Sequence, residues 1–203
     1  MSGGPGPAFW DERYSGDTYV YGTEPNAHLT RAVAGQPAGD ALCLADGEGR
    51  NGVYLATLGH RVTSVDLSAV GLEKAARLAR ERGVALTTVQ ADLASFDFGT
   101  ARWDLVVSIF AHVAHPIRVR LHGELARALR PGGLFVLEAY TPAQIGRGTG
   151  GPPTAELMMT LDGLRSELAG LDIVHGVELE RNVEEGAGHR GVGAVVQVVA
   201  VRR

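Results

Sequence analysis

Residues 42–51, with the sequence LCLADGEGRN, lead from a short apolar run through two glycines into an amphipathic segment. A strand-turn-helix unit of this kind is typical of doubly wound α/β folds, in which ligands bind beyond the carboxyl ends of the strands. Gly47 and Gly49 carry no side chain, so a ligand can approach the backbone closely there. Taken alone, the same turn could be an ordinary connection between a strand and a helix.

From residue 41 onward, short apolar runs alternate with longer amphipathic stretches, as expected for βαβ units around a mostly parallel sheet. We predict strands at residues 41–45, 62–66, 85–89, 103–109 and 133–139, and helices at 50–58, 68–82, 117–129 and 154–169. Two strands at 172–180 and 191–202 flank the polar, glycine-rich residues 182–190 and should pair antiparallel. The predicted class is therefore α/β, a doubly wound seven-stranded Rossmann-like sheet, mostly parallel with a C-terminal antiparallel hairpin.

The chain has 203 residues, of which 45% are hydrophobic, and this length and composition predict a single domain over residues 1–203. Residues 1–35 hold five of its twelve aromatic side chains. We expect this segment to form a short helix and a loop that cover the domain, with residues 36–203 as the Rossmann-like core. The aromatic residues in question are Phe9, Trp10, Tyr14, Tyr19 and Tyr21.

Charge and composition argue against several partners. A formal net charge of −4 leaves no strongly basic surface, so we expect no nucleic-acid substrate. Cys43 is the one cysteine, which excludes an internal disulfide and fits a reducing compartment. The start of the sequence has no signal-peptide pattern and no apolar run reaches membrane-spanning length, so we expect a cytoplasmic protein with no membrane contact. The sequence leaves open whether the protein is a monomer or a homodimer.

Two acids follow later strands at the same edge of the sheet. Asp66 ends the second predicted strand, 20 residues after Asp46, where a carboxylate can accept hydrogen bonds from both ribose hydroxyls. Its alternative role is to help cap the next helix, although Ser68 is itself a competent cap. Asp92 follows the third strand and could accept a hydrogen bond from an adenine amino group, or could be a turn residue without a ligand.

The charge of the turn distinguishes between nucleotide ligands. Asp46 and Glu48 would repel the pyrophosphate of NAD or FAD, which requires an uncharged cradle at the helix N-terminus. A sulfonium ligand with an α-ammonium group is attracted to such acids. The turn therefore favours S-adenosylmethionine.

With these motifs in this order, the chain resembles the class I methyltransferases, which use S-adenosylmethionine. The resemblance extends to residues 129–134, LRPGGL, ahead of the fifth strand. Residues 9–14, FWDERY, and 21–26, YGTEPN, resemble the opening of small bacterial enzymes related to tellurite-resistance and thiopurine methyltransferases. The chain departs from the family's usual turn at Cys43, where the family has an acid, and at Ala45, where it has glycine.

The resemblance implies a cofactor site for S-adenosylmethionine. It places the methionine portion at the glycine-rich turn, the ribose and adenine at the ends of the second and third strands, the floor under the sulfonium at the end of the fourth, and aromatic rings opposite. The implied residues are Ala45, Asp46, Gly47, Glu48, Gly49 and Asn51; Asp66 and Leu67; Ala91, Asp92 and Leu93; Ser108, Ile109 and Phe110; and Tyr14 and Tyr21.

Methyl transfer from a sulfonium is an in-line displacement, so the protein mainly supplies alignment, desolvation and, where the nucleophile carries a proton, a base. His112 follows the fourth strand and is the candidate catalytic base, with His115 as a weaker candidate. Its alternative role is structural, at the start of the next helix. The two histidines have no convincing third ligand, so we predict no metal site.

The acceptor side is expected at the end of the fifth strand, marked by Glu138 and Tyr140. Residues 146–153 form either a substrate-side lid or a flexible connection. The sequence favours methyl transfer to a small-molecule nucleophile, with a thiol or chalcogen species suggested by the resemblance and an oxygen or nitrogen acceptor nearly as plausible. Two alternatives are a noncatalytic S-adenosylmethionine-binding regulatory module and a nicotinamide-dependent oxidoreductase, which the acids of the turn disfavour.

Overall fold

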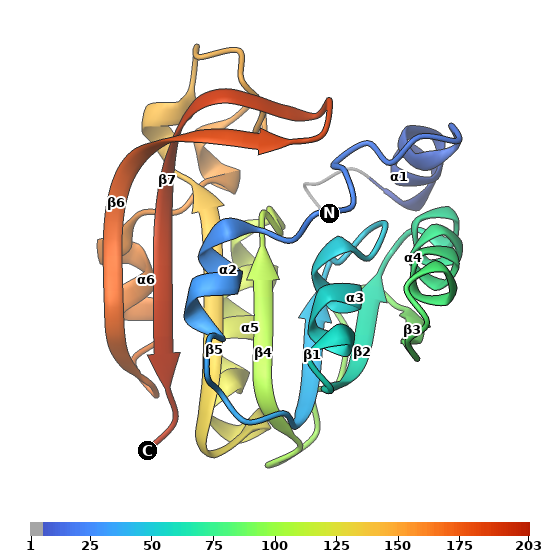
Figure 1. The fold of residues 1–203 in the computed structure, drawn as a ribbon. Coiled ribbons are helices and arrows are strands. Elements are labelled where there is room, and N and C mark those ends of the chain that lie inside the picture. Colours follow the sequence, from blue (N-terminus) through green and yellow to red (C-terminus); the bar gives the residue numbers. More distant parts are fainter. Residues whose placement is uncertain (1–5) are drawn as a thin grey trace.

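Seven strands form one sheet in the computed structural model, which describes residues 6–203. Residues 1–5, the beginning of the glycine- and proline-rich start, lie outside the described residues. The strands are β1 (Asp40–Leu44), β2 (Arg61–Asp66), β3 (Thr87–Gln90), β4 (Trp103–Ile109), β5 (Leu129–Tyr140), β6 (Asp172–Glu185) and β7 (His189–Val201). Their order is β3-β2-β1-β4-β5-β7-β6, with β7 antiparallel to both of its neighbours (Figure 1). The predicted α/β class with a C-terminal antiparallel hairpin is confirmed.

Helices cover both faces of this sheet. They are α1 (Pro7–Tyr14), α2 (Ala27–Ala32), α3 (Arg50–Thr57), α4 (Ala69–Glu81), α5 (His115–Ala128) and α6 (Leu161–Glu167), with two 3-10 helices, η1 (Pro142–Gln144) and η2 (Ala155–Leu157). In Figure 1, α2 and α3 lie in front of the sheet and α5 lies behind it. Within residues 6–203, no helix has the length and apolar character needed to span a membrane.

Alternation along the strands divides the core between the two faces. Leu42 and Leu44 of β1 pack in the cluster that includes α5 and α6, whereas Ala41 and Cys43 pack in the cluster that includes α2 and α3. This is the two-residue period of a strand buried on both sides. The order of strands reverses between β1 and β4, which places a ligand crevice beyond their carboxyl ends.

The predicted hairpin is correct in kind but wrong in extent. We expected residues 182–190 to form a polar loop, yet β6 continues to Glu185 and β7 begins at His189. Val183 and Glu185 are buried while Asn182 and Glu184 are exposed, which is the alternation of a strand. The sequence concealed this strand because its inward-facing side chains include charged residues.

Other boundaries also differ from the predictions. The expected helix at 154–169 is broken into η2 and α6, because Thr160 caps a new helix by accepting a hydrogen bond from the Gly163 amide at 3.2 Å. β3 begins at Thr87, two residues later than expected, and β5 begins at Leu129, four residues earlier. Leu129 pairs with Trp103 ahead of an irregularity in the β4–β5 register.

Candidate functional site

A cavity of about 560 Å³ lies beyond the carboxyl ends of β1, β2 and β4. Its volume falls within the range of about 300–1,000 Å³ that is usual for small-molecule sites. Four parts of the chain enclose it: the N-terminal cover, the glycine-rich turn with the ends of β2 and β3, the end of β4 with the start of α5, and a loop and hairpin turn from the C-terminal third. Among its lining residues are Trp10, Arg13, Tyr14, Tyr21, Asp46, Gly47, Glu48, Arg50, Asn51, Asp66, Leu67, Asp92, Leu93, Ile109, Phe110, His112, Gly150, Gly151, Pro152, Pro153 and Gly188.

The glycine-rich turn adopts left-handed backbone conformations. The φ angles are 48° at Ala45, 57° at Gly47 and 87° at Gly49, which is the N-cap of α3. A Cβ on Gly47 would lie 2.7 Å from the Tyr14 hydroxyl oxygen, so only glycine lets the cover sit this close. Ala45 holds the same left-handed region as a non-glycine residue, and the departure from the family pattern therefore leaves the shape of the turn intact.

Asp66 orients this turn from the end of β2. Its Oδ2 accepts a hydrogen bond from the Gly47 amide and its Oδ1 accepts one from the Ser68 amide, both at 2.8 Å. Ser68 caps α4 by accepting a hydrogen bond from the Gly71 amide at 3.0 Å, as the sequence predicts. Burial raises the pKa of Asp66. A carboxylate has about four acceptor positions, so the two amides leave acceptor capacity for a ligand.

The acids of the turn are paired within the protein, which corrects the charge argument made from the sequence. Glu48 forms a buried ion pair with Lys74 and accepts a hydrogen bond from the Val20 amide at 2.7 Å. Asp46 accepts hydrogen bonds from the Ser64 hydroxyl and from the Gly52 amide. Neither acid is therefore the unpaired charge that the sequence argument assumed. Burial raises the pKa of Asp46 to about 6.

The adenine-side predictions divide into two groups. Leu67, Asp92 and Leu93 border the cavity, whereas Ala91 is not among its lining residues. Asp92 is exposed, and its Oδ1 accepts a hydrogen bond from the Ala94 amide at 2.8 Å. Asp92 therefore forms a turn and also borders the cavity, and its contact with adenine stays a prediction.

The end of β4 forms one wall of the cavity, but Ser108 takes no part in it. Ile109 and Phe110 line the cavity, while Ser108 faces the opposite side of the sheet, beside Leu121 and Leu125 of α5. We had predicted that all three residues from 108 to 110 would lie under the sulfonium. The prediction fails for Ser108 because neighbouring strand residues point to opposite faces.

His112 does not have the geometry of a free catalytic base, and this corrects our candidate. Its Nδ1 lies 2.9 Å from the carbonyl oxygen of Leu157, and its Nε2 lies 3.3 Å from the amide nitrogen of Tyr140. With Nδ1–H donating and Nε2 accepting, both ring nitrogens serve the backbone. His115 is exposed and does not line the cavity. Within residues 6–203, no group of three potential metal ligands was found.

Aromatic rings of the cover close the side opposite the sheet. Trp10 stacks on Tyr14 with ring centroids 5.8 Å apart, and Tyr14 meets Tyr21 edge-on at 6.4 Å. All three border the cavity, as the sequence predicts for the cover. Burial, and then the nearby charge of Asp66, raise the pKa of Tyr14. Its hydroxyl therefore stays protonated.

Of the residues expected on the acceptor side, part of the loop lines the cavity and Glu138 does not. Residues 150–153 line the cavity. Gln144 Nε2 donates hydrogen bonds of 2.9 Å to the Thr149 hydroxyl and to the Gly150 carbonyl, which anchors this loop. Glu138 is fully buried in an ionic network and is not among the residues that line the cavity.

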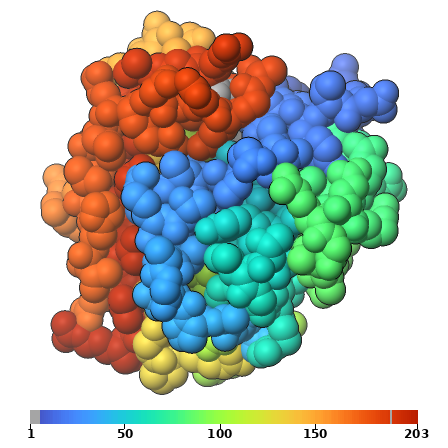
Figure 2. All heavy atoms as spheres, in the orientation of Figure 1, coloured from blue at the N-terminus to red at the C-terminus, as the bar shows by residue number. Residues whose placement is uncertain are grey.

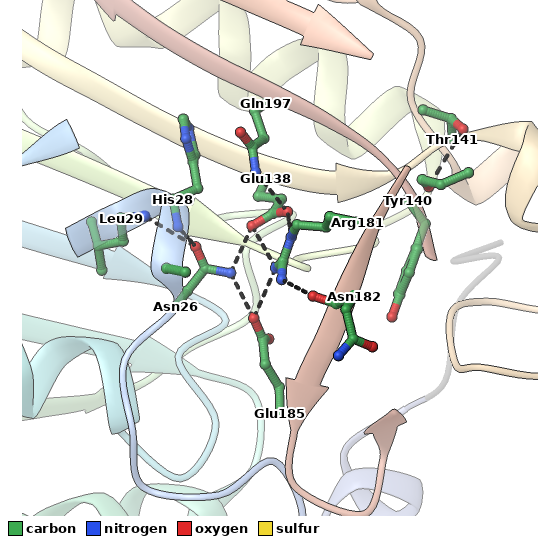
Figure 3. Close-up of polar contacts among 12 residues, drawn as sticks. Asn26, His28, Leu29, Glu138, Tyr140, Thr141, Arg181, Asn182, Glu185 and Gln197 are labelled. Atoms are coloured by element: carbon green, nitrogen blue, oxygen red, sulfur yellow. Dashed lines mark hydrogen bonds and ion pairs between the residues drawn. The ribbon is translucent and has the colours of Figure 1, made fainter. Parts of the chain in front are cut away.

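That network joins four parts of the chain (Figure 3). Arg181 of β6 donates to both carboxylate oxygens of Glu138 and to Glu185. Asn26 Nδ2 donates to Glu138 at 2.7 Å and to Glu185 at 2.8 Å. Glu185 also pairs with Arg50, which lines the cavity directly after the glycine-rich turn.

Sequence reasoning missed several residues around the site. Arg13 and Arg50 line the cavity, and Gly188 reaches it from the hairpin turn. Arg13 lies within FWDERY, one residue before Tyr14, and that motif was the available signal. Arg50 and Gly188 carried no local signal, because their positions depend on contacts with residues far away in the sequence.

The cavity, the turn and the strand order invite comparison with known proteins. Residues 41–133 match a family model described as a methyltransferase domain. This stretch, a little under half of the chain, is similar to a methyltransferase domain. A search of curated protein sequences found no match. The family match favours methyl transfer over the nicotinamide-dependent alternative, and with it S-adenosylmethionine as the cofactor.

Several solved structures have the same fold as this chain. A protein studied in the conversion of a disulfide bond into a thioacetal group during echinomycin biosynthesis matches with a TM-score of 0.78 and 22% identity, over 97% of this chain and 91% of that chain. TehB from Haemophilus influenzae matches with a TM-score of 0.71 and 16% identity, over 97% of this chain and 67% of that chain. The N-methyltransferase NodS from Bradyrhizobium japonicum, solved with S-adenosyl-L-homocysteine, matches with 0.70 and 15%, over 97% of each chain. At these identities the likeness concerns the fold.

Proposed function

We propose that this methyltransferase transfers a methyl group to a small soft nucleophile, a thiol or a related chalcogen species, inside the cavity beyond β1 and β4. One observation carries the proposal. The cavity is enclosed and lined by aromatic rings, and both ring nitrogens of His112 are hydrogen-bonded to backbone groups. A site of this kind aligns and desolvates two reactants but offers little help in removing a proton.

The residues around the cavity fit S-adenosylmethionine. The left-handed glycines at 47 and 49 leave backbone open beside α3, where the amino-acid portion would lie along residues 45–49 and Asn51. Asp66 retains acceptor capacity for ribose hydroxyls, and Leu67, Asp92 and Leu93 would surround the adenine. Ile109 and Phe110 would form the floor, with Tyr14 above and Tyr21 beside it toward the acceptor, and these assignments are part of the proposal.

When bound, S-adenosylmethionine supplies an electrophilic methyl group on a sulfonium. The chain's contribution is to hold the acceptor in line with that group and to exclude water around both. Trp10, Tyr14 and Tyr21 cover the cavity from one side, and residues 150–153 close it beside His112. His112 positions this loop, since its Nδ1 bonds to the Leu157 carbonyl.

A thiol suits such a site for a chemical reason. Free thiols have pKa values near 8.5, so a few per cent is already the nucleophilic thiolate at pH 7. Alcohols and protonated amines need a base in the transition state, and that base usually contributes about 10²- to 10⁴-fold in rate. Among the described residues 103–128 that line the cavity, His112 is the titratable one, and both of its ring nitrogens are already engaged.

Two of the structural likenesses agree with this acceptor class. One is to a protein of disulfide-to-thioacetal conversion, and the other is to TehB, related by name to the tellurite-resistance enzymes that the N-terminal motifs resemble. Both identities are low, so the chemistry of the site carries the proposal and the likenesses only support it.

The test has two parts. Calorimetric titration should show binding of S-adenosylhomocysteine, and turnover with labelled S-adenosylmethionine should be seen with thiols in a panel of thiols, amines and phenols. The rate at subsaturating thiol should rise with pH along the ionisation of each thiol, so that acceptors of lower pKa reach their plateau earlier. Methylation confined to amines or phenols, or a pH profile that is the same for every thiol, would overturn the proposed acceptor class. Binding without turnover on any acceptor would instead support the noncatalytic alternative.

A further inference from the structure

The hairpin end formed by residues 181–191, here called the arm, contacts the N-terminal cover. The Gly188 amide donates a hydrogen bond of 3.1 Å to the Val20 carbonyl. A Cβ added to Gly186 would clash with the backbone of Val20 and Gly22. Figure 2 shows the orange-red arm against the blue N-terminal segment. Arm and cover therefore meet through backbone, with no side chain between them at this point.

The arm also joins the loop on the other side of the cavity. The Thr149 hydroxyl donates a hydrogen bond of 3.1 Å to the Val192 carbonyl, directly beyond the arm. A Cβ on Gly191 would lie 2.7 Å from the Thr149 methyl group. Gln144 accepts from the Ala194 amide at 2.9 Å while it donates to the Gly150 carbonyl, so the loop and β7 share one amide side chain.

Buried charges fix the base of the arm. Glu185 forms an ion pair with Arg50. It also bonds to Arg181 and Asn26, and Arg181 in turn bonds to Glu138 of β5 (Figure 3). Two arginines and two glutamates make the network formally neutral, and all four side chains are 14% exposed or less. Removing one partner of such a set leaves an uncompensated buried charge, so the network holds the arm in one position.

Tyr21 stands where the arm meets the cavity. A Cβ on Gly188 would clash with the Tyr21 ring, so the ring rests directly on the backbone of the arm. Its other side meets Tyr14 edge-on, and both Tyr21 and Gly188 line the cavity. The arm belongs to β6 and β7 on the β5 side of the sheet, whereas Asp66 and Asp92 lie at the other end of the strand order. This places Tyr21 at the acceptor end of the cavity.

We propose that Tyr21, held between the arm and the cover, is the specificity-determining residue that limits the size of the acceptor. The inference rests on the proposed thiol methyltransferase function. The wall behind the ring is the backbone of Gly188, and the arm that carries it is fixed by the buried network, so the ring cannot move back to admit a bulkier molecule. The enzyme accepts small thiols and rejects thiols with a large substituent on the carbon next to sulfur.

The experiment measures kcat/KM for a small alkyl thiol and a bulky aryl-substituted thiol in wild type and variants. Tyr21→Ala should raise the bulky-to-small ratio by about tenfold or more, the lower end of what one missing group in an apolar pocket changes. Tyr21→Phe should keep the wild-type ratio, because the ring volume remains. Val174→Ala is the matched control, since Val174 is 65% exposed on β6 outside the arm.

Affinity for S-adenosylhomocysteine provides the second measurement, and Tyr21→Ala should change it by less than about threefold. If Tyr21→Ala does not fold, Tyr21→Leu shortens the side chain and keeps apolar packing, with the same direction of change expected. If the wild type methylates thiols and the bulky-to-small ratio of kcat/KM is unchanged in both Tyr21→Ala and Tyr21→Leu, this inference is overturned while the proposed function stands. A changed ratio in Tyr21→Phe would also overturn it, because the hydroxyl would then be responsible. Absence of thiol turnover in wild type would instead overturn the proposed function on which the inference rests.

Discussion

Ala45 offers a direct test of how the glycine-rich turn tolerates a non-glycine residue. Its φ of 48° lies in the left-handed region, which costs an L-residue about 1–2 kcal/mol. Replacing alanine by glycine relieves that strain. It also increases the conformational entropy of the unfolded chain, which stabilises the unfolded state by about 0.4–1 kcal/mol. The half-buried methyl group of Ala45 contributes about 0.4 kcal/mol more, half the value of a buried methylene. Taking midpoints, Ala45→Gly should stabilise the fold by about 0.4 kcal/mol.

Two matched variants make this small number decisive. Ala101 has a φ of 46° and is exposed, so Ala101→Gly relieves the same strain without loss of buried surface and should gain about 0.8 kcal/mol. Ala76 lies inside α4, where glycine costs about 1 kcal/mol relative to alanine. For a chain of this length, 1 kcal/mol corresponds to about 2–4 °C in Tm.

Urea unfolding and thermal unfolding of the three variants supply the free energies of unfolding. Titration with S-adenosylhomocysteine should show less than about threefold change in Kd for Ala45→Gly, because the turn already has the shape that glycine adopts. A loss of stability in Ala45→Gly as large as that in Ala76→Gly would refute the reasoning, since it would mean that the left-handed backbone at Ala45 carries no strain.

Three further perturbations address the site. Asp66→Ala removes an acceptor shared by two backbone amides and should weaken S-adenosylhomocysteine binding by about 1–3 kcal/mol in calorimetry; unchanged affinity would remove Asp66 from the site. His112→Gln should lower kcat by less than about tenfold, whereas a loss of 10²- to 10⁴-fold with a shifted pH profile would restore His112 as a base. Because the pKa of Asp46 is raised to about 6, its contribution to stability is full below about pH 4 and is lost as pH rises through about 6. In Asp46→Asn, the free energy of unfolding measured in urea should therefore decrease less between about pH 4 and 6 than in the wild type. The same pH dependence in both proteins would contradict this role of Asp46.

Local patterns were enough to predict the parallel part of the sheet. β1, β2, β4 and β5 each place apolar side chains on both faces and are followed by a turn or an amphipathic helix, so their type was readable without distant contacts. Asp66 was found for the same reason, since the end of a strand and its distance from the turn are both local features. The helix predictions at 50–58 and 68–82 match α3 and α4 within one residue at each end.

Polar residues that become buried were the source of most errors. Residues 182–185 were read as a loop because their charges suggested solvent, yet Glu185 is neutralised by Arg50, which lies 135 positions earlier. Glu138 was expected on the acceptor side because it ends the fifth strand at the same edge of the sheet, although Arg181 donates to both of its carboxylate oxygens. His112 was expected to act as a base, but its partners at Leu157 and Tyr140 depend on the folded loop. No local pattern encodes such pairings.

The charged residues in and beside the glycine-rich turn attach the segments that form the walls of the cavity. Glu48 pairs with Lys74 and binds the backbone of Val20, which attaches the cover, while Arg50 pairs with Glu185, which attaches the arm. All four charged side chains are at most 9% exposed, and loss of one partner from such a pair costs about 3–5 kcal/mol. The cover and the arm are thus both bonded to residues in or beside the turn that is proposed to hold the cofactor. Glu48, one of the two acids that pointed to S-adenosylmethionine in the sequence, therefore acts by closing the cavity around a ligand, since Lys74 already compensates its charge.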